Sequence, residues 1–75
     1  MKEYQLTLQA QWRPEVLERI LRVVRHRGFR LVQLEMNSSE TQIELAFKVA
    51  GERPIENLVS QLDKLFDVQQ IDVQQ

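Results

Sequence analysis

Residues 14–29 read PEVLERILRVVRHRGF, a stretch whose apolar positions recur with the period of an α-helix. Its apolar residues lie three and four positions apart and form one stripe. They are Val16, Leu17, Ile20, Leu21, Val23 and Val24. Pro14 is typical of a first helical turn, and Gly28 is typical of the residue just past a helix. We therefore expect one amphipathic helix from Pro14 to about Arg27.

Alternating apolar residues before this helix predict a strand with one buried face. They are Tyr4, Leu6, Leu8, Ala10 and Trp12, all expected to face the core. Residues 29–36 predict a second strand, whose apolar phase changes between Leu31 and Val32. A β-bulge, or partial cover on both faces, would explain that change. The polar run 37–40 predicts a turn, and residues 43–49 alternate cleanly, as the partner strand of a hairpin would.

The second half of the chain repeats the pattern of the first half. Residues 51–54, GERP, end the third strand and open a second helix, which is followed by a short strand over 68–73. The apolar stripe of this helix comprises Ile55, Leu58, Val59, Leu62, Leu65 and Phe66. The order strand–helix–strand–strand–helix–strand is the split βαβ arrangement of ferredoxin-like folds. We expect an α+β fold with a four-stranded antiparallel sheet in the order 4-1-3-2 and both helices on one face.

Length and composition limit the number of domains and the classes of partner. A chain of 75 residues has room for one domain, which we expect over 1–75 with its core at about 3–74. Domains of this size often gain stability by association. Ten basic and eleven acidic residues argue against a general nucleic-acid binder. The alternating start is unlike a signal peptide, and no apolar run approaches the ~18 residues of a membrane span. We expect a cytoplasmic protein that binds neither nucleic acid nor membrane.

Residues for catalysis are scarce. His26 is the only histidine and has no evident carboxylate partner, and the serines lie in no nucleophile elbow. Gly28 and Gly51 are the only glycines, which excludes a glycine-rich phosphate loop, and there is no cysteine. We expect no catalytic residue, no metal site and no cofactor on this chain.

A basic stretch at the end of the first helix is one candidate interaction site. Glu15–Arg19 and Glu18–Arg22 have the favourable i, i+4 spacing of helical ion pairs. Four further basic residues have no such partner: Arg25, His26, Arg27 and Arg30. Three interpretations remain open, namely a solvated face, a docking surface for an acidic patch on a partner protein, and a nucleic-acid contact. Because no aromatic residue is interleaved with the arginines, the nucleic-acid interpretation is the weakest.

The start of the first helix is a second candidate site. Free N–H groups at a helix N-terminus can bind a carboxylate, and Arg13 as the N-cap residue would not compete for them. Glu15, however, lies in the first turn, where its charge favours the helix dipole and repels an incoming carboxylate. These residues therefore predict a poor anion site.

Three blocks of the chain resemble a known family. WRPEVLERILRVVRHRGFRLVQLEM, TQIELAFKV and LVSQLDKLFDVQQIDV are similar to the ACT domain of acetolactate (acetohydroxyacid) synthase small subunits of the isozyme II type. The resemblance implies a regulatory subunit that binds and activates a large catalytic subunit, which carries thiamin diphosphate, FAD and magnesium and serves branched-chain amino-acid biosynthesis. It also implies a homodimer through the edge strand after the first helix. The residues of that edge are Leu31, Val32, Leu34 and Met36.

The chain departs from the family pattern in its effector loop. Members that bind an amino acid usually have Asn in this loop and Pro-Gly two residues later. The loop residues here are Trp12, Arg13, Pro14, Glu15 and Val16, so an indole replaces the Asn and a carboxylate replaces the Gly. We expect a subunit that activates its partner but binds valine weakly or not at all. The alternatives are a stand-alone ACT-like amino-acid sensor of another pathway and an unrelated ferredoxin-like enzyme or RNA-binding module.

Overall fold

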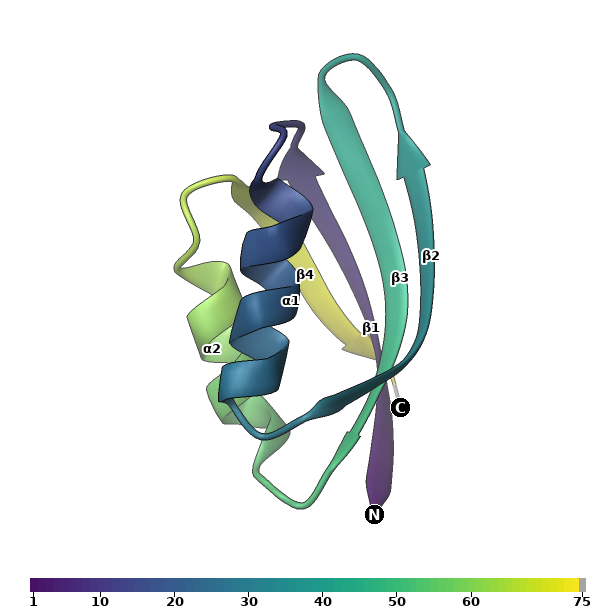
Figure 1. Cartoon of the computed structure of the whole chain (residues 1–75), viewed down its shortest axis with the longest axis vertical. Coiled ribbons are helices and arrows are strands. Elements are labelled where there is room, and N and C mark those ends of the chain that lie inside the picture. The colour runs from purple at the N-terminus through teal and green to yellow at the C-terminus, as the bar shows by residue number, and fades with distance from the viewer. Residues whose placement is uncertain (75) are drawn as a thin grey trace.

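Six elements make up the computed structural model of the chain, which describes residues 1–74 (Figure 1). The strands are β1 (Lys2–Gln11), β2 (Arg30–Ser38), β3 (Gln42–Gly51) and β4 (Val68–Gln74). The helices are α1 (Val16–His26), between β1 and β2, and α2 (Ile55–Asp63), between β3 and β4. Residue 75, with which the expected domain ends, lies outside the described residues.

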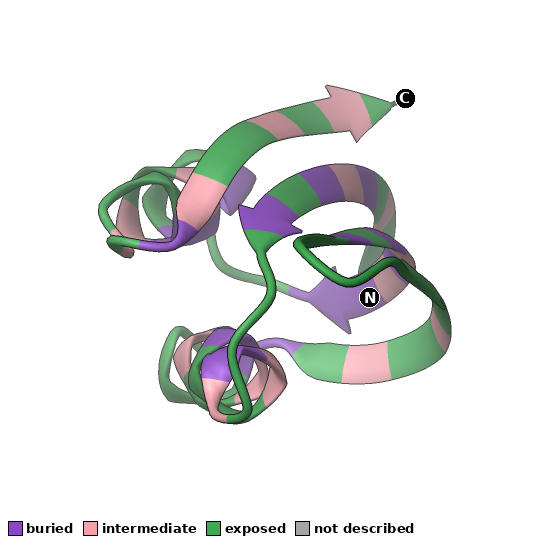
Figure 2. Ribbon diagram, turned by 90° about the horizontal axis from the view of Figure 1, so that it is seen from above, coloured by how far each residue is buried: buried purple, intermediate pink, exposed green. Residues whose placement is uncertain are grey.

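The four strands form one antiparallel sheet in the order β2-β3-β1-β4, which confirms the predicted order 4-1-3-2. The two cleanly alternating segments, β1 and β3, are the central strands. Their register places Leu6 opposite Phe47 and Leu8 opposite Leu45, so the apolar positions of both strands point to the same face. Both helices lie on one side of the sheet (Figure 2). The predicted ferredoxin-like α+β architecture is therefore confirmed.

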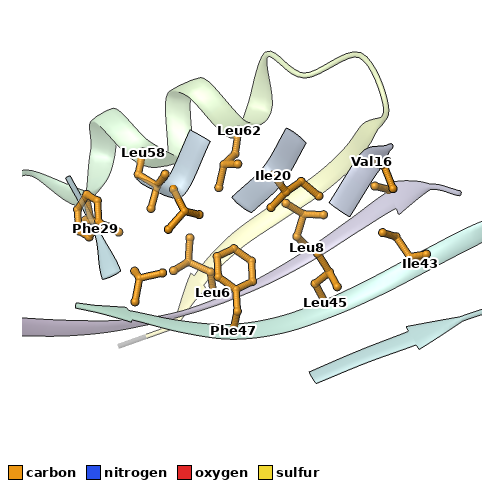
Figure 3. Packing of buried hydrophobic residues seen from close by; sticks show 14 residues of the cluster. Leu6, Leu8, Val16, Ile20, Phe29, Ile43, Leu45, Phe47, Leu58 and Leu62 are labelled. Carbon is orange, nitrogen blue, oxygen red and sulfur yellow. The ribbon is translucent and has the colours of Figure 1, made fainter. Parts of the chain in front are cut away.

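The core fills the space between the helices and the sheet (Figure 3). From α1 it receives Val16, Ile20 and Val24, each no more than 3% exposed. Leu17 and Leu21, which also belong to the predicted stripe, are half-buried, and Leu17 packs against the core. The fully buried face of α1 therefore consists of three residues of the predicted stripe.

The helix α1 is shorter at its start than predicted. Pro14 and Glu15 form a turn in which the Val16 N–H donates to the Arg13 carbonyl at 3.2 Å. The N-cap residue is consequently Glu15 and not Arg13, and its side chain makes no capping hydrogen bond. The expectation of a helix beginning at Pro14 with Arg13 as its cap is wrong, because this tight turn precedes the first α-helical residue.

The end of α1 matches the prediction closely. Gly28 has φ +85°, the left-handed conformation that glycine adopts most readily. The Phe29 N–H donates to the Val24 carbonyl at 3.2 Å, and the Gly28 N–H donates to the Arg25 carbonyl at 3.1 Å. This pair of bonds is a Schellman motif, which ends the helix and brings the Phe29 ring into the core.

The edge strand β2 has the predicted irregularity but different bounds. The register with β3 shifts between Leu31 and Gln33, so Val32 is the extra residue of a β-bulge. The strand starts at Arg30, because Phe29 belongs to the helix-ending motif. It continues to Ser38, because residues 37 and 38 still pair with β3, and the turn is confined to 39–41. The predicted strand 29–36 and turn 37–40 are corrected accordingly.

Two aromatic residues expected in the core are exposed. Trp12 is 42% exposed, because β1 ends at Gln11 and the chain then turns toward α1. Phe66 is 84% exposed, because α2 ends at Asp63 and the following turn rotates residue 66 away from the helical stripe. Both residues lie in connections where the period of the neighbouring element no longer applies.

Candidate functional site

The predicted effector loop, residues 12–16, lies at the end of the molecule where three connections meet. Figure 1 shows the β1–α1 loop, the α2–β4 connection and the β2–β3 turn toward the same end. Two main-chain hydrogen bonds join them. The Gln11 N–H donates to the Asp67 carbonyl at 2.8 Å, and the Trp12 N–H donates to the Thr41 carbonyl at 2.9 Å. The start of the loop is thus held by two segments distant in sequence.

A buried carboxylate, which sequence reasoning missed, lies beside this loop. Asp67 is 3% exposed and is the only buried polar or charged residue within residues 1–74. The Nε–H of Arg13 donates to its Oδ1 at 2.7 Å. The Nη1 of Arg19 lies 3.7 Å from its Oδ2. A buried charge is costly unless it is paired, and here both oxygens face a guanidinium group.

Only a weak sequence signal pointed to Asp67. The residue is an acid directly before an apolar strand, at a position that belongs to neither the helical nor the strand pattern. Its principal partner, Arg13, is 54 residues away. Such a pairing becomes visible only when β4 is placed beside β1.

Glu15 completes the charges at the loop. Its carboxylate lies 4.0 Å from Arg19, which confirms the predicted i, i+4 pair. The other predicted pair, Glu18–Arg22, is not among the ion pairs within residues 1–74. Two arginines and two acids therefore balance at this end, and the Glu15 side chain lies at the positive end of α1.

One exposed aromatic side chain contacts this loop, and a second one belongs to it. The guanidinium carbon of Arg13 lies 5.9 Å from the centroid of the Phe66 ring, within the range of a cation–π contact. Trp12, the residue before Arg13, is also exposed. Arg13 is thus positioned by a carboxylate on one side and by an aromatic ring on another.

The basic stretch lies at the opposite end of α1. Its residues are all exposed: Arg25, His26, Arg27 and Arg30. In the described part of the chain, none of them takes part in an ion pair. Their charges are therefore available to an acidic surface or to solvent.

The predicted dimer edge is an outer strand of the sheet, since β2 pairs only with β3 among the described strands. Leu31 and Leu34 are half-buried, whereas Val32 and Met36 are 42% and 47% exposed. The cross-strand partners of Leu34 and Met36 are Phe47 and Leu45, so these side chains point to the helix-covered face. An outer strand with exposed apolar residues is open to pairing with another chain.

Residues 1–74 contain no group of three His, Asp or Glu side chains suited to holding a metal ion. None of their helices has the length and apolar character needed to cross a membrane. The structure brings Arg13, Glu15, Arg19 and Asp67 together in one loop cluster, whereas the basic stretch and the outer strand are separate surfaces.

The fold and the sequence together define an ACT domain, since the sequence model described as "ACT domain" matches residues 12–71. The ACT domain of GTP pyrophosphokinase from Chlorobium tepidum superposes with a TM-score of 0.84 at 9% identity, covering 96% of both chains. The acetolactate synthase small subunit of Thermotoga maritima superposes with a TM-score of 0.82 at 24% identity, covering 97% of this chain and 47% of that one. At these identities, the two structures demonstrate the shared fold alone.

Sequence similarity identifies the family more narrowly. The acetolactate synthase isozyme 2 small subunit of Escherichia coli K12 is 44% identical over 70 residues, covering 91% of this chain and 80% of that protein. The Shigella flexneri protein of the same name matches equally well. The chain belongs to the family of ACT-domain acetolactate synthase small subunits, as the sequence blocks indicated.

Proposed function

We propose that this chain is a regulatory subunit that binds the large catalytic subunit of acetolactate synthase and raises its activity. The observation that carries the proposal is the 44% identity to an isozyme 2 small subunit over nearly the whole chain. On this proposal, the reaction of the large subunit belongs to branched-chain amino-acid biosynthesis, and the complex is cytoplasmic. Thiamin diphosphate, FAD and magnesium would be bound by the large subunit, and one ACT domain would span residues 1–75.

Two surfaces are proposed for assembly. Two copies would pair through β2, whose exposed Val32 and Met36 would become covered by the partner strand. The basic stretch from Arg25 to Arg30 would dock against an acidic patch of the large subunit. Its exposure and its lack of ion pairs within residues 1–74 support this assignment.

We further propose that the chain binds valine weakly or not at all. Glu15 would repel the carboxylate of an amino acid at the start of α1. Arg13 and Arg19, the cations nearest to the loop, already face the Asp67 carboxylate. An incoming carboxylate would therefore meet two acids, Glu15 and Asp67, whose charges already balance the two guanidinium groups of this cluster.

Reconstitution tests the proposal directly. The acetolactate synthase large subunit of the same organism is purified alone, and acetolactate formation is measured while this chain is added. We expect activity to rise to a plateau at a fixed ratio of the two chains, and the two chains to co-purify. Added valine should leave the plateau unchanged.

Three results would contradict all or part of this proposal. Unchanged activity, with no co-purification, would refute the regulatory role. Tight binding of an amino acid to the isolated chain, without any effect on the large subunit, would instead favour a stand-alone sensor. Micromolar valine binding by calorimetry, together with normal activation, would refute only the statement about valine.

A further inference from the structure

Two guanidinium groups from different segments surround one buried carboxylate at the effector loop. Arg13 comes from the loop itself and approaches Oδ1 of Asp67 at 2.7 Å, whereas Arg19 comes from α1 and approaches Oδ2 at 3.7 Å. The Asp67 side chain is 2% exposed. Proteins commonly hold the carboxylate of a ligand in this way, with a charged donor at each oxygen.

The main chain around Asp67 is held independently of its side chain. The Gln11 N–H bonds to the Asp67 carbonyl, and the Val68 N–H bonds to the Leu65 carbonyl at 3.1 Å. Arg13 also contacts the Phe66 ring. Removing the carboxylate should therefore leave the two guanidinium groups close to their present positions, around a space that had held a carboxylate.

The remaining charges favour an anion in that space. Without Asp67, Arg13 and Arg19 would face only Glu15, which is 4.0 Å from Arg19 and 43% exposed. The positive end of α1 lies beside them, and the N-cap side chain occupies none of its N–H groups. The cluster would then carry an excess positive charge next to a small, largely enclosed space.

We propose that Asp67 is a built-in carboxylate ligand of the effector loop, and that it excludes external carboxylates from the Arg13–Arg19 pair. Its removal opens a site for small carboxylates such as formate and acetate. This inference rests on the proposed function, because that function makes residues 12–16 an effector loop. It concerns the isolated chain, however, and is tested without the large subunit. If the chain did not activate the large subunit, the inference about Asp67 would be unaffected. If the inference about Asp67 were wrong, the proposed activation would be unaffected.

The test is chemical rescue of the full chain. Thermal unfolding of Asp67→Ala and Asp67→Ser is followed by circular dichroism in sodium formate, sodium acetate and sodium chloride at equal ionic strength. Asp67→Asn is the volume control, because its amide fills the same space without charge. Asp72→Ala is the matched acid control, because Asp72 is exposed on β4 and its carboxylate bonds only to Gln70 among the described residues.

We expect Asp67→Ala and Asp67→Ser to unfold about 5 °C or more higher in the carboxylate salts than in chloride. The difference should be smaller in Asp67→Asn and absent in the wild type and in Asp72→Ala. If both small variants are unfolded in chloride, recovery of their folded spectrum in formate or acetate is the readout. Equal behaviour in chloride and carboxylate, or equal rescue of Asp72→Ala, would overturn the inference.

Discussion

The Nε of Arg13 lies 2.7 Å from Oδ1 of Asp67, although 54 residues separate them in the chain. This contact joins the loop before α1 to the connection before β4. It is also the shorter of the two ion-pair contacts that the buried carboxylate makes with arginines. An internal ion pair therefore crosses the loop that the family resemblance led us to predict as the effector loop.

Replacing Arg13 with Gln should destabilise the domain. Asp67 would stay buried with only Arg19, at 3.7 Å, as a charged partner. Leaving a buried polar group with incomplete partners costs about 1–3 kcal/mol. Urea unfolding should show this loss in Arg13→Gln, whereas Arg27→Gln, a change at an exposed arginine, should stay within about 0.5 kcal/mol of the wild type. Equal stability of the two variants would show that the pair contributes little.

Truncation should destabilise the domain much more at Leu62 than at Phe66, although the two residues lie four positions apart in the predicted helical stripe. Leu62 is fully buried, so Leu62→Ala should cost about 2–5 kcal/mol through lost burial and cavity formation. Phe66 is 84% exposed and contacts Arg13, so Phe66→Ala should cost about 1 kcal/mol or less. Denaturant titrations of both variants check this order. A large loss in Phe66→Ala would mean that this ring is buried in solution.

Charge reversal in the basic stretch should weaken activation of the large subunit. Arg25→Glu combined with Arg30→Glu replaces two exposed positive charges without removing a core side chain. If these arginines face an acidic patch, the half-saturating concentration should rise about tenfold or more, and high salt should reduce the difference from the wild type. Lys64→Glu, which reverses an exposed charge beyond the end of α2, should activate normally. Unaltered activation by the double variant would place the interface elsewhere.

Lysines on the outer strand should produce a monomer. Val32→Lys combined with Met36→Lys places two charges on an edge that we propose pairs with a second copy. Analytical ultracentrifugation should show a smaller species than the wild type at the same concentration. Gln70→Lys, on the other outer strand β4, serves as the control and should keep the assembly of the wild type. A monomeric wild-type chain would refute pairing through β2.

Restoring the family pattern in the loop should strengthen valine binding. Trp12→Asn removes the indole, and Glu15→Gly removes the carboxylate from the start of α1. We expect calorimetry to report valine binding about tenfold or more tighter in the double variant, because repulsion at the helix N-terminus is gone. Glu18→Gln removes an exposed acid of the first helical turn outside the loop and should change binding much less. Identical valine binding in the wild type, the double variant and Glu18→Gln would show that Glu15 and Trp12 do not cause weak valine binding.

Much of the fold could be predicted because local patterns and tertiary structure agree in the elements. The period-two alternation of β1 and β3 predicted the central strands, and Gly28 predicted the end of α1. The phase change near Val32 predicted the bulge. The errors in burial at Trp12 and Phe66 fall just beyond the ends of elements, because a turn there breaks the periodicity from which burial is inferred.

The candidate site could be predicted only in part. Glu15 and its pairing with Arg19 follow from helical spacing, which depends on residues four apart. Asp67 could not be found in this way, because its partners lie in a loop and a helix at the other end of the chain. A single buried acid carries no periodic signal.

The sequence by itself determined the order of the elements, the topology of the sheet and the family, because each depends on periodicity or on contiguous blocks of residues. Tertiary structure alone decided that Asp67 meets Arg13 and Arg19 at the predicted effector loop. The antiparallel pairing of β4 with β1 brings the residue before β4 next to the end of β1, where the Gln11 N–H bonds to the Asp67 carbonyl. Burial there makes the Asp67 carboxylate require the charged partners that Arg13 and Arg19 supply.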